Sequence, residues 1–482
     1  MDLQALVNGL NDIIWSKALI YLCLGTGIYF SILTRFVQVR HIKGMVTQLF
    51  TGGSSETGVS SFQGFAMALG GRVGTGNIAG VATAIAMGGP GALFWMWAIA
   101  FLGAGSAYIE SALAQVWKEE QNGQYVGGPA YYIEKGMGQK WYAIIFAVSA
   151  LLACGIFLPG VQANSIASGI ENAFKVPTWV TGLVVSALLA FIIFGGVKRI
   201  GKAAELIVPF MAIGYIIMAL IIIIVNIGQL PAVLALIFKS AFGADAVFGS
   251  IVGTAISWGV KRGIYSNEAG QGTGPIAAAA AEVSHPAKQG LVQAFSVYVD
   301  TLFVCSATGF MILITGTYNT INPAGGFLNE GLPGVAYGPA FTQEAVNTLI
   351  PGFGGGFVAV ALFFFAFTTL MAYAYYAEAN LAYLFKNNKM ASYLIKAFLI
   401  AMTFYGSIRT ADLAWGLGDV GVGLMAWLNI IAIIILTKPG LATLRDYEAQ
   451  QKEGKDPVFD PAKLGIKNAE LWTNKIDKKY AK

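Results

Sequence analysis

The sequence predicts an all-α polytopic membrane protein with eleven transmembrane helices. Of its 482 residues, 56% are apolar and only 11% are charged, whereas a soluble domain typically carries about 25% charged residues. Several long windows also contain no Asp, Glu, Lys or Arg, among them 73–109, 206–238 and 346–377. Each window can hold a membrane helix of about 20 residues. A membrane β-barrel would instead show alternating segments of about ten residues.

The expected spans follow one another with short connections. They cover residues 16–35, 60–84, 92–116, 141–171, 177–196, 204–227, 246–282, 290–316, 340–385, 391–406 and 412–437. The seventh and ninth are longer than a bilayer requires, so we expect breaks or loop helices within them. Lys17 precedes the first apolar run and a second span follows soon after, so no cleavable signal is expected.

Lys and Arg are concentrated in alternate connections, and this bias predicts the orientation. With the N-terminus outside, the inner loops hold most of these residues: Arg35, Arg40, Lys43, Lys118, Lys135, Lys140, Lys198, Arg199, Lys202, Lys288, Lys386, Lys389 and Lys396. The outer segments hold only Lys17, Lys175, Lys239 and Arg409. We therefore expect a multi-pass protein of the cell membrane with a cytoplasmic, partly disordered C-terminal tail.

The second span has a glycine-rich centre, Gly70-Gly71-Arg72-Val73-Gly74-Thr75-Gly76-Asn77. Each glycine costs roughly 1 kcal/mol against alanine inside a helix. Unwound backbone at membrane depth is tolerated only where protein or a water-filled cavity satisfies its polar groups. A discontinuous helix of this kind predicts a site where free carbonyls bind a cation and a half-helix N-terminus binds an anionic group.

A second interrupted span starts near Asp245, and it has the same spacing between a glycine and a following proline as the first. Gly76 is followed fourteen residues later by Pro90, and Gly272 is followed fourteen residues later by Pro286. The second segment starts five spans after the first, so the two cross the membrane in opposite directions, as in transporters built from inverted repeats. The predicted organisation is a leading helix and connector (1–55), two five-helix repeats (56–230 and 240–437) and a cytoplasmic tail (438–482).

Polar residues near these breaks are candidates for substrate contact, each with a structural alternative. Thr75 and Asn77 could line a pocket or serve as hydrogen-bonding glue between helices. Gln162 follows a proline in the fourth span, and packing is as reasonable as substrate contact. Ser257 and Trp258 lie in the middle of the seventh span, where Trp258 could be a lid or a plain packing residue.

Thr368 and Thr369 are adjacent hydroxyls in a long apolar run. They could bond back to their own helix, or they could join carbonyls of the first break in an all-oxygen site for a small hard cation. Arg72 is costly at membrane depth and could pair with Glu110 or Glu268 or contact substrate.

Three further charged residues, Lys261, Arg262 and Glu268, are expected to form a gate network on the cytoplasmic side. No lone carboxylate is expected at the centre of either break, which favours sodium over proton coupling. Glu268 is the candidate if protons are coupled.

Other classes of function find little support. Gly74-x-Gly76-x-x-Ala79 formally matches a dinucleotide fingerprint, but no strand precedes it and no acidic residue follows at the required distance. The chain contains only two histidines and no zinc-protease motif or nucleophile elbow, so an enzyme is not expected. The net charge of +5 comes mostly from the tail and indicates no nucleic-acid partner.

The sequence resembles the alanine or glycine:cation symporter family of the amino acid–polyamine–organocation superfamily. The resemblance extends to about residue 440 and rests on five blocks: GTGNIAGVATAI (74–85), GGPGALFWMW (88–97), YVGGPAYYIEKG (125–136), VKRGIYSNEAGQGTGP (260–275) and FFFAFTTLMAYAYYAE (363–378). It implies a LeuT-type five-plus-five inverted repeat with two discontinuous helices. It also implies Na⁺-coupled symport of small neutral amino acids, alanine or glycine, by alternating access.

The resemblance also implies roles for individual residues. Half-helix amides near Gly74, Gly76 and Asn77 would bind the substrate carboxylate, with Thr75, Gln162, Ser257 and Trp258 as further substrate candidates. The backbone of Gly70 and Val73 would join Thr368 and Thr369 around sodium. Expected partners are the amino acid, Na⁺ and the lipid bilayer, with no obligatory protein partner. A proton-coupled symporter and an amino-acid-gated ion channel stay open as alternatives.

Overall fold

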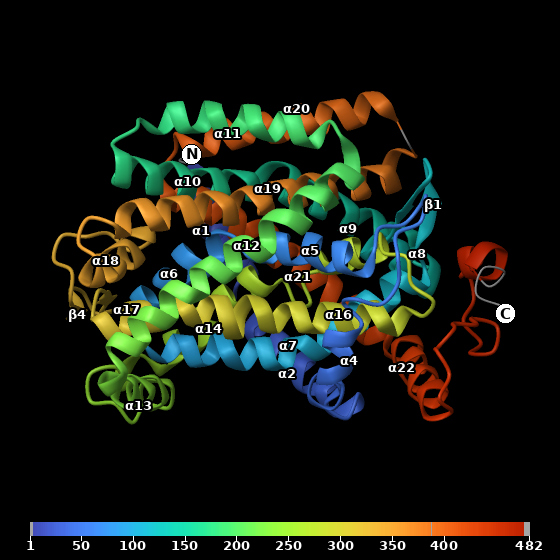
Figure 1. The fold of residues 1–482 in the computed structure, drawn as a ribbon, viewed down its shortest axis with the longest axis horizontal. Helices are drawn as coiled ribbons and strands as arrows, with labels where there is room; N and C mark the ends of the chain where they lie inside the picture. The colour runs from blue at the N-terminus through green and yellow to red at the C-terminus, as the bar shows by residue number, and fades with distance from the viewer. Residues whose placement is uncertain (1–2, 387, 477–482) are drawn as a thin grey trace.

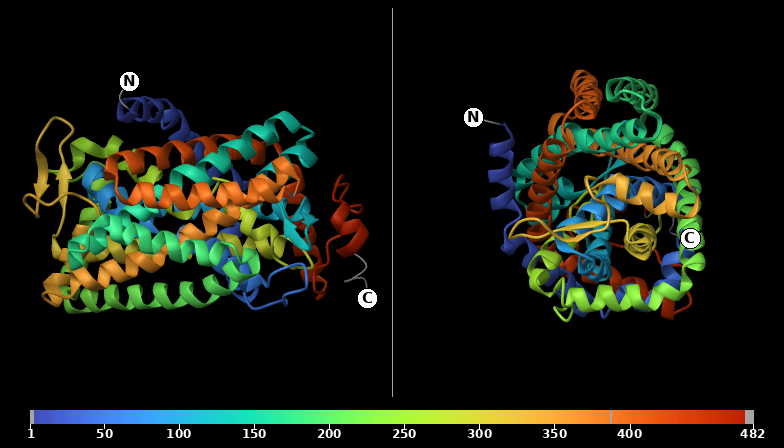
Figure 2. Two further views of the ribbon diagram at one scale, coloured as in Figure 1. Left: turned by 90° about the horizontal axis from the view of Figure 1, so that it is seen from above. Right: turned by 90° about the vertical axis from the view of Figure 1, so that its left-hand side faces the viewer.

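The computed structural model describes residues 3–386 and 388–476, most of which are helical. The long helices lie side by side along one axis of the molecule (Figure 1). Seen along that axis, they form a ring around central segments from both halves of the chain (Figure 2). The predicted helical bundle is therefore the observed architecture.

Within the described residues, seven helices are long and apolar enough to cross a membrane. They are α7 (Gly91–Val116), the α9–η2–α10 rod (Lys140–Leu152, Ala153–Phe157, Leu158–Phe174), α12 (Gly196–Val225), the α16–η5–α17 rod (Pro286–Tyr298, Val299–Cys305, Ser306–Thr315), α19 (Gly354–Phe385), α20 (Lys389–Ser407) and α21 (Ala411–Ile435). An eighth is formed if α1 (Leu3–Ile14) and α2 (Lys17–Leu33), which meet at a 44° bend, count as one span. The polytopic helical fold is confirmed, whereas the count of eleven spans and the inverted repeat stay predictions.

The first glycine-rich span is interrupted where the sequence predicts it. Helix α5 (Ser61–Arg72) begins with a capping box, in which the Ser60 hydroxyl accepts from the Gln63 amide and the Gln63 side chain accepts from the Ser60 amide. After the break at Val73 and Gly74, the helix resumes as η1 (Gly76–Gly80) and α6 (Val81–Gly88).

The second interruption separates α14 (Val252–Asn267) from α15 (Gly274–Ala279). The connection contains two glycines with positive φ, Gly270 at 78° and Gly272 at 92°. A Cβ at Gly272 would lie 2.9 Å from side-chain atoms of Phe146 and Pro129, so both the conformation and the space favour glycine.

Short elements connect the long helices. They are α3 (Val37–Arg40), α4 (Ile42–Thr47), α8 (Pro129–Met137), α11 (Thr178–Ile193), η3 (Ile227–Gln229), α13 (Leu230–Ala241), η4 (Gly249–Ile251), α18 (Pro339–Leu349), α22 (Thr437–Lys452) and η6 (Trp472–Ile476). Two antiparallel hairpins, β1 (Glu119–Gln121) with β2 (Gln124–Val126) and β3 (Asn319–Ile321) with β4 (Phe327–Glu330), lie at opposite ends of the bundle (Figure 1). The loop helix α18 explains why the ninth predicted span was too long.

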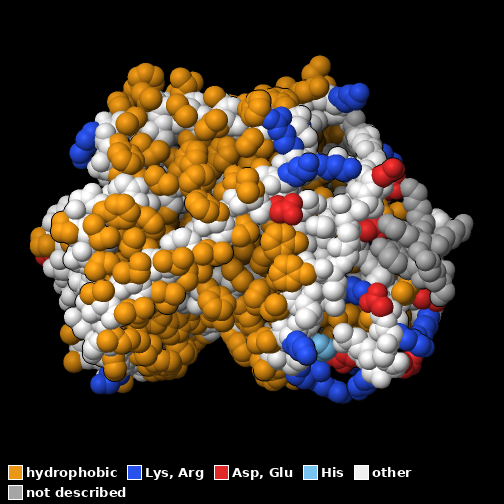
Figure 3. Space-filling model, viewed as in Figure 1, with side chains coloured by type: hydrophobic (Ala, Val, Ile, Leu, Met, Phe, Trp, Pro, Cys, Tyr) orange, Lys and Arg blue, Asp and Glu red, His pale blue; other side chains and the backbone are white. Residues whose placement is uncertain are grey.

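The outer surface carries a broad apolar belt. Figure 3 shows hydrophobic side chains over most of one face, with charged side chains gathered mainly toward the end that carries α22 and β1. Large side chains on α11, α12 and α20 are strongly exposed, including Phe191, Leu206, Phe210 and Met390. A belt of this size is typical of a surface that contacts lipid.

The C-terminal segment is more ordered than the sequence predicts. Helix α22 is followed by a strap, residues 453–471, that crosses the end of the bundle and leads into η6 (Figure 1). Phe459 and Trp472 are fully buried, and the Trp472 indole donates to the Gln115 carbonyl at 2.8 Å. The expected partial disorder is therefore wrong for this segment, because its apolar residues have a docking surface on α7; residues 477–482 lie outside the described part.

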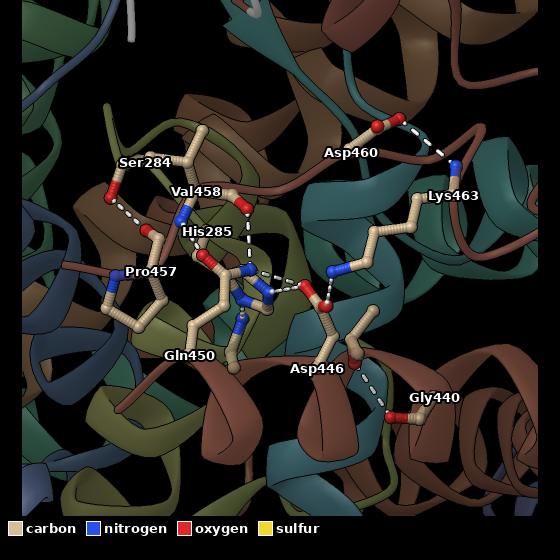
Figure 4. Close-up of polar contacts among 11 residues, drawn as sticks. Ser284, His285, Gly440, Asp446, Gln450, Pro457, Val458, Asp460 and Lys463 are labelled. Atoms are coloured by element: carbon tan, nitrogen blue, oxygen red, sulfur yellow. Dashed lines mark hydrogen bonds and ion pairs between the residues drawn. The ribbon is translucent and has the colours of Figure 1, made fainter. Parts of the chain in front are cut away.

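Buried polar contacts hold this segment near the start of α16 (Figure 4). His285 Nε2 lies 3.3 Å from Asp446 Oδ2, and Asp446 also binds Lys463 at 3.2 Å and Gln450 at 2.7 Å. Lys288 adds an ion pair with Asp456 at 2.5 Å. His285 and Asp446 lie outside the membrane-length helices, so their ionisation can couple to docking.

Acidification is expected to weaken the docking of residues 446–474. Burial lowers the pKa of His285, with the Asp446 carboxylate opposing this shift. Burial acts to raise the pKa of Asp446, but hydrogen bonds from His285, Lys463 and Gln450 outweigh it and the pKa is lowered. Both groups therefore bind protons less readily when docked, so docking loses free energy as pH falls below about 6.5 for His285, and further below about 3.9 for Asp446.

Hydrogen exchange of this segment in lipid nanodiscs at pH 7.5 and pH 5.5 tests this expectation. We expect faster exchange at pH 5.5 after correction for the intrinsic chemical rate, and a smaller pH effect in His285→Gln. Equal protection at both pH values would contradict it.

Candidate functional site

The first break brings the predicted sodium ligands together. The Thr369 hydroxyl of α19 lies 2.9 Å from the Gly70 carbonyl and 3.4 Å from the Val73 carbonyl. It also lies 3.1 Å from the Phe365 carbonyl of its own helix. One hydroxyl proton cannot serve three carbonyl oxygens at once, so this cluster of oxygens has lone pairs to spare for a small cation.

Thr368 lies beside this cluster but contacts it less directly. Its hydroxyl donates to the Phe365 carbonyl at 2.9 Å, as the structural alternative predicts. A Cβ built on Gly70 would lie 3.4 Å from Thr368 Cβ and 3.8 Å from its Oγ1, so the two residues are in close contact. Both threonines are 1% exposed, and a rotation of the Thr368 side chain would be needed to bring its oxygen to the carbonyls.

The amide groups of the break are held by side-chain oxygens. The Gly74 amide donates to Asn77 Oδ1 at 2.8 Å, and the Thr75 amide donates to Gln162 Oε1 at 3.0 Å. The Thr75 hydroxyl is buried without a hydrogen-bond partner among the described residues. Gly74, Thr75, Asn77 and Gln162 thus form one polar cluster, in which a substrate carboxylate would have to replace the Asn77 and Gln162 oxygens at the two amides.

Two glycines of this cluster keep the neighbouring helices close. A Cβ at Gly74 would collide with Thr369 Oγ1 and lie 2.9 Å from Gln162 Oε1. A Cβ at Gly76 would lie 3.1 Å from the Ser266 Cα of α14. The glycines therefore let α14 and α19 approach the break from two sides.

A cavity of about 1300 Å³ opens at the end of the bundle opposite α22. Trp258 lines it, together with Ala79 and Thr83 of the first broken helix. Ser257 is not among the residues that line this cavity. The structure therefore brings Trp258, but not Ser257, toward the predicted pocket.

A charged and aromatic cluster lines the cavity beside the first broken helix, where a Cβ built on Gly80 would lie 3.6 Å from Trp415 and 3.9 Å from Arg262. Arg262 and Lys261 bind Asp419 at 2.6 Å and 2.8 Å. The Arg262 guanidinium also lies 4.6 Å from the centre of the Trp415 ring and 5.3 Å from that of Trp258. This arrangement closes the inner end of the cavity with an ion pair and stacked rings.

The predicted gate network is corrected by this geometry. Lys261 and Arg262 face the cavity whose rim includes Lys175, Tyr337 and Thr410, which is the end away from the basic loops and the C-terminal segment. By the predicted orientation this is the outer end, not the cytoplasmic one. Glu268 lies apart from both, because α14 ends one residue before it and the chain turns inward.

Arg72 makes no ion pair with any carboxylate of the described residues, so the alternative that pairs it with Glu110 or Glu268 is not seen, and the alternative of substrate contact stays open. Its Nε donates to the Asn267 carbonyl at 2.6 Å, and its Nη1 donates to Gln293 Oε1 at 2.9 Å and to the Ser296 hydroxyl. Neutral acceptors thus hold the guanidinium between the two broken helices.

Sequence reasoning named Glu110 and Glu268 but missed the Asp300 carboxyl beside the first break. Asp300 accepts from Asn77 Nδ2 at 2.7 Å and from the Ser266 and Thr301 hydroxyls. Glu268 lies in the connection of the second broken helix and is fully buried. The expectation that no carboxylate lies at either break is therefore wrong; the available signal was a lone acidic residue in each of two apolar spans.

Comparison with known proteins identifies the family. Residues 1–461 match the sodium:alanine symporter family over nearly the whole chain. The protein belongs to this family. A Bacillus subtilis member described as a putative sodium/proton-dependent alanine carrier, YrbD, is 65% identical, with 97% of both chains covered.

Other members of the sodium:alanine symporter family carry related descriptions. A sodium/proton-dependent alanine carrier of Bacillus sp. (strain PS3) is 54% identical over 89% of this chain and 97% of that protein. The sodium/alanine symporter AgcS of Methanococcus maripaludis is 38% identical over 95% of this chain and 100% of that one. Membership makes this protein a transporter and not an enzyme.

Solved structures support the fold of this symporter-family chain. MhsT in complex with L-phenylalanine superposes with a TM-score of 0.54 at 13% identity, covering 88% of this chain and 96% of that one. A Na⁺-coupled sialic acid symporter superposes with a TM-score of 0.52 at 12% identity, covering 96% of both chains. The chain thus shares a LeuT-like fold with these proteins.

Proposed function

We propose that this protein is a sodium-coupled symporter that takes up small neutral amino acids, alanine or glycine, by alternating access. The observation that carries the proposal is the cluster of Gly70, Val73 and Thr369 oxygens directly beside the amides of Gly74 and Thr75. Cation and amino acid would then bind to the same interrupted helix. The descriptions of family members as sodium/alanine symporters or sodium/proton-dependent alanine carriers support the same assignment.

Binding at one break offers a physical reason for coupling. A cation at the carbonyl cluster offsets part of the cost of a substrate carboxylate at low dielectric. Each ligand shifts the conformational equilibrium only by its differential affinity for the two states, so both must favour the same closed arrangement. Arg262, Trp258 and Trp415 would close over the occupied site from the cavity side.

The pocket is proposed to favour small side chains. Gly74 and Gly76 hold α14 and α19 close to the break, which leaves little room between them. We further propose that the protein lies in the cell membrane with its N-terminus outside, which places the large cavity on the outer side. The positive-inside distribution of Lys and Arg supports this orientation.

Uptake of labelled alanine into proteoliposomes tests the proposal. We expect accumulation under an inward Na⁺ gradient and little uptake when K⁺ replaces Na⁺. Unlabelled glycine should compete, whereas a bulky amino acid such as tryptophan should not. Uptake that is unchanged in K⁺ would exclude sodium coupling.

Proton coupling in place of sodium is the second candidate. The buried carboxyls of Glu268 and Asp300 favour it, because each is fully buried near the breaks. An inward proton gradient without Na⁺ would then drive alanine accumulation. Conduction far above carrier turnover rates without accumulation would instead indicate a channel.

A further inference from the structure

Glu268 has an unusual position for a buried acid. It caps α14 in the left-handed conformation, with φ of 56°, at the point where the second broken helix is interrupted. Its side chain is fully buried, and neither carboxyl oxygen has a hydrogen-bond partner among the described residues. The Thr273 hydroxyl is the side-chain donor beside this carboxyl, and it lies outside hydrogen-bond geometry with any partner among the described residues. This acid therefore lacks the donors that an ionised carboxylate requires.

The two neighbouring acids, Glu110 and Asp300, accept hydrogen bonds from protein groups. Glu110 accepts from the Gly270 amide at 3.1 Å and from Asn429 Nδ2 at 2.7 Å. Asp300 accepts from three side chains, at distances between 2.7 and 3.1 Å. Donors at these distances stabilise a negative charge in a buried site. Among the three acids, Glu268 is thus the one whose surroundings suit the neutral, protonated form.

The nearby guanidinium does not supply the missing partner. Arg72 is directed to the Asn267 carbonyl, Gln293 and Ser296, and it makes no ion pair with Glu268 among the described residues. The titratable and charged groups that face Glu268 are Arg72, Glu110, Cys154, Tyr265, Asp300, Tyr373 and Tyr376. Glu110 and Asp300 are carboxylic acids and Arg72 is the base among them. The net charge of these groups therefore does not favour a third negative charge at Glu268.

We propose that Glu268 is a proton-binding site and that one proton enters with sodium and the amino acid. This inference rests on the proposed symport function and adds a second coupled ion to it. On the outer side, a water-borne proton binds a carboxylate oxygen of Glu268 and forms an O–H bond. When the connection between α14 and α15 opens to the other side, the same O–H bond breaks and the proton passes to water there. Closure then buries the protonated acid in the position that the Glu268 side chain has in this structure.

The test measures alanine uptake and proton movement in the same proteoliposomes. A pH-sensitive dye is trapped inside, Na⁺ is supplied outside, and equal K⁺ with valinomycin holds the voltage at zero. We expect lumenal acidification that requires both alanine and the Na⁺ gradient. A leak driven by entering Na⁺ would have the opposite sign, because a positive interior expels protons.

Glu268→Gln keeps the size of the side chain but cannot bind the proton. We expect it to retain Na⁺-driven uptake of labelled alanine while the acidification per alanine falls at least tenfold. Glu110→Gln is the matched control, since it removes a buried acid that is already hydrogen-bonded, and its acidification per alanine should match the wild type. Glu268→Asp retains a carboxyl and should acidify the lumen with a shifted pH profile.

Three outcomes would overturn the proton site. They are wild-type uptake without acidification, Glu268→Gln acidifying as the wild type does, and a pH profile of Glu268→Asp identical to the wild type. Na⁺-driven uptake of labelled alanine is recorded in every sample. A failure of the proton proposal therefore leaves that signal intact, whereas a failure of the symport proposal removes it.

Discussion

Replacing Thr369 by alanine raises the Na⁺ concentration for half-maximal alanine uptake at least tenfold. The Thr369 hydroxyl lies within 3.4 Å of both the Gly70 and Val73 carbonyls, so its loss removes one oxygen from the proposed sodium site. Loss of a hydrogen bond or ligand to a charged group costs about 1.5–3 kcal/mol, and 1.4 kcal/mol corresponds to a factor of ten in affinity. Initial uptake rates at graded Na⁺ concentrations measure the change.

Two control variants show whether the loss of Na⁺ affinity is specific to the Thr369 hydroxyl at the proposed sodium site. Thr368→Ala should have a smaller effect on Na⁺ affinity, because its hydroxyl donates to Phe365 and makes no hydrogen bond to Gly70 or Val73. Thr403→Ala removes another fully buried threonine that bonds back to its own helix, at 2.8 Å to the Leu399 carbonyl, and should leave Na⁺ affinity unchanged. An unchanged sodium dependence in the double variant of Thr368 and Thr369 would remove both hydroxyls from the site.

Gly74→Ala reduces Na⁺-dependent alanine uptake to less than a tenth of the wild-type rate. The added methyl group would collide with the Thr369 hydroxyl and lie 2.9 Å from Gln162 Oε1. Overpacking of this kind costs typically 1–3 kcal/mol, and here it displaces the two side chains that define the break. Uptake in proteoliposomes, normalised to the reconstituted protein, measures the loss.

Gly214→Ala is the matched control for that variant. Gly214 lies in α12, and a Cβ built on it meets no atom within 4 Å. Alanine is preferred over glycine in a helix interior by roughly 1 kcal/mol, so this variant should fold and transport as the wild type does. Wild-type uptake in Gly74→Ala would show that the close approach of α19 to the break is not needed.

Local chemistry made the interrupted helices predictable. Glycines at 70, 71, 74 and 76 destabilise a continuous helix wherever it is placed, and the structure breaks at Val73 and Gly74. The long apolar windows likewise predicted membrane-length helices, because a charge-free apolar stretch of about 20 residues is typical of a transmembrane helix. Thr368 and Thr369 were recognisable as adjacent hydroxyls in such a stretch.

Partners distant in sequence could not be predicted in the same way. The C-terminal tail was expected to be partly disordered because its own sequence is short and highly charged. The surface that buries Trp472 belongs to α7, which is distant in the sequence. The ion pairs of Lys261 and Arg262 could not be foreseen, because their partner, Asp419, lies 157 residues beyond Arg262. An ion pair was one of two alternatives for Arg72, but packing brought neutral acceptors to its guanidinium.

Composition and glycine spacing by themselves determined that this chain is a helical membrane protein with two weakened spans. Tertiary structure alone decided that the Thr369 oxygen meets a carbonyl 299 residues away. It also decided that Glu110 and Asp300 accept hydrogen bonds, while the Glu268 oxygens make none to the described residues. The physical reason is that helix breaking is a local property of the backbone. The stabilisation of a cation or a carboxylate depends on which groups packing brings within about 3 Å.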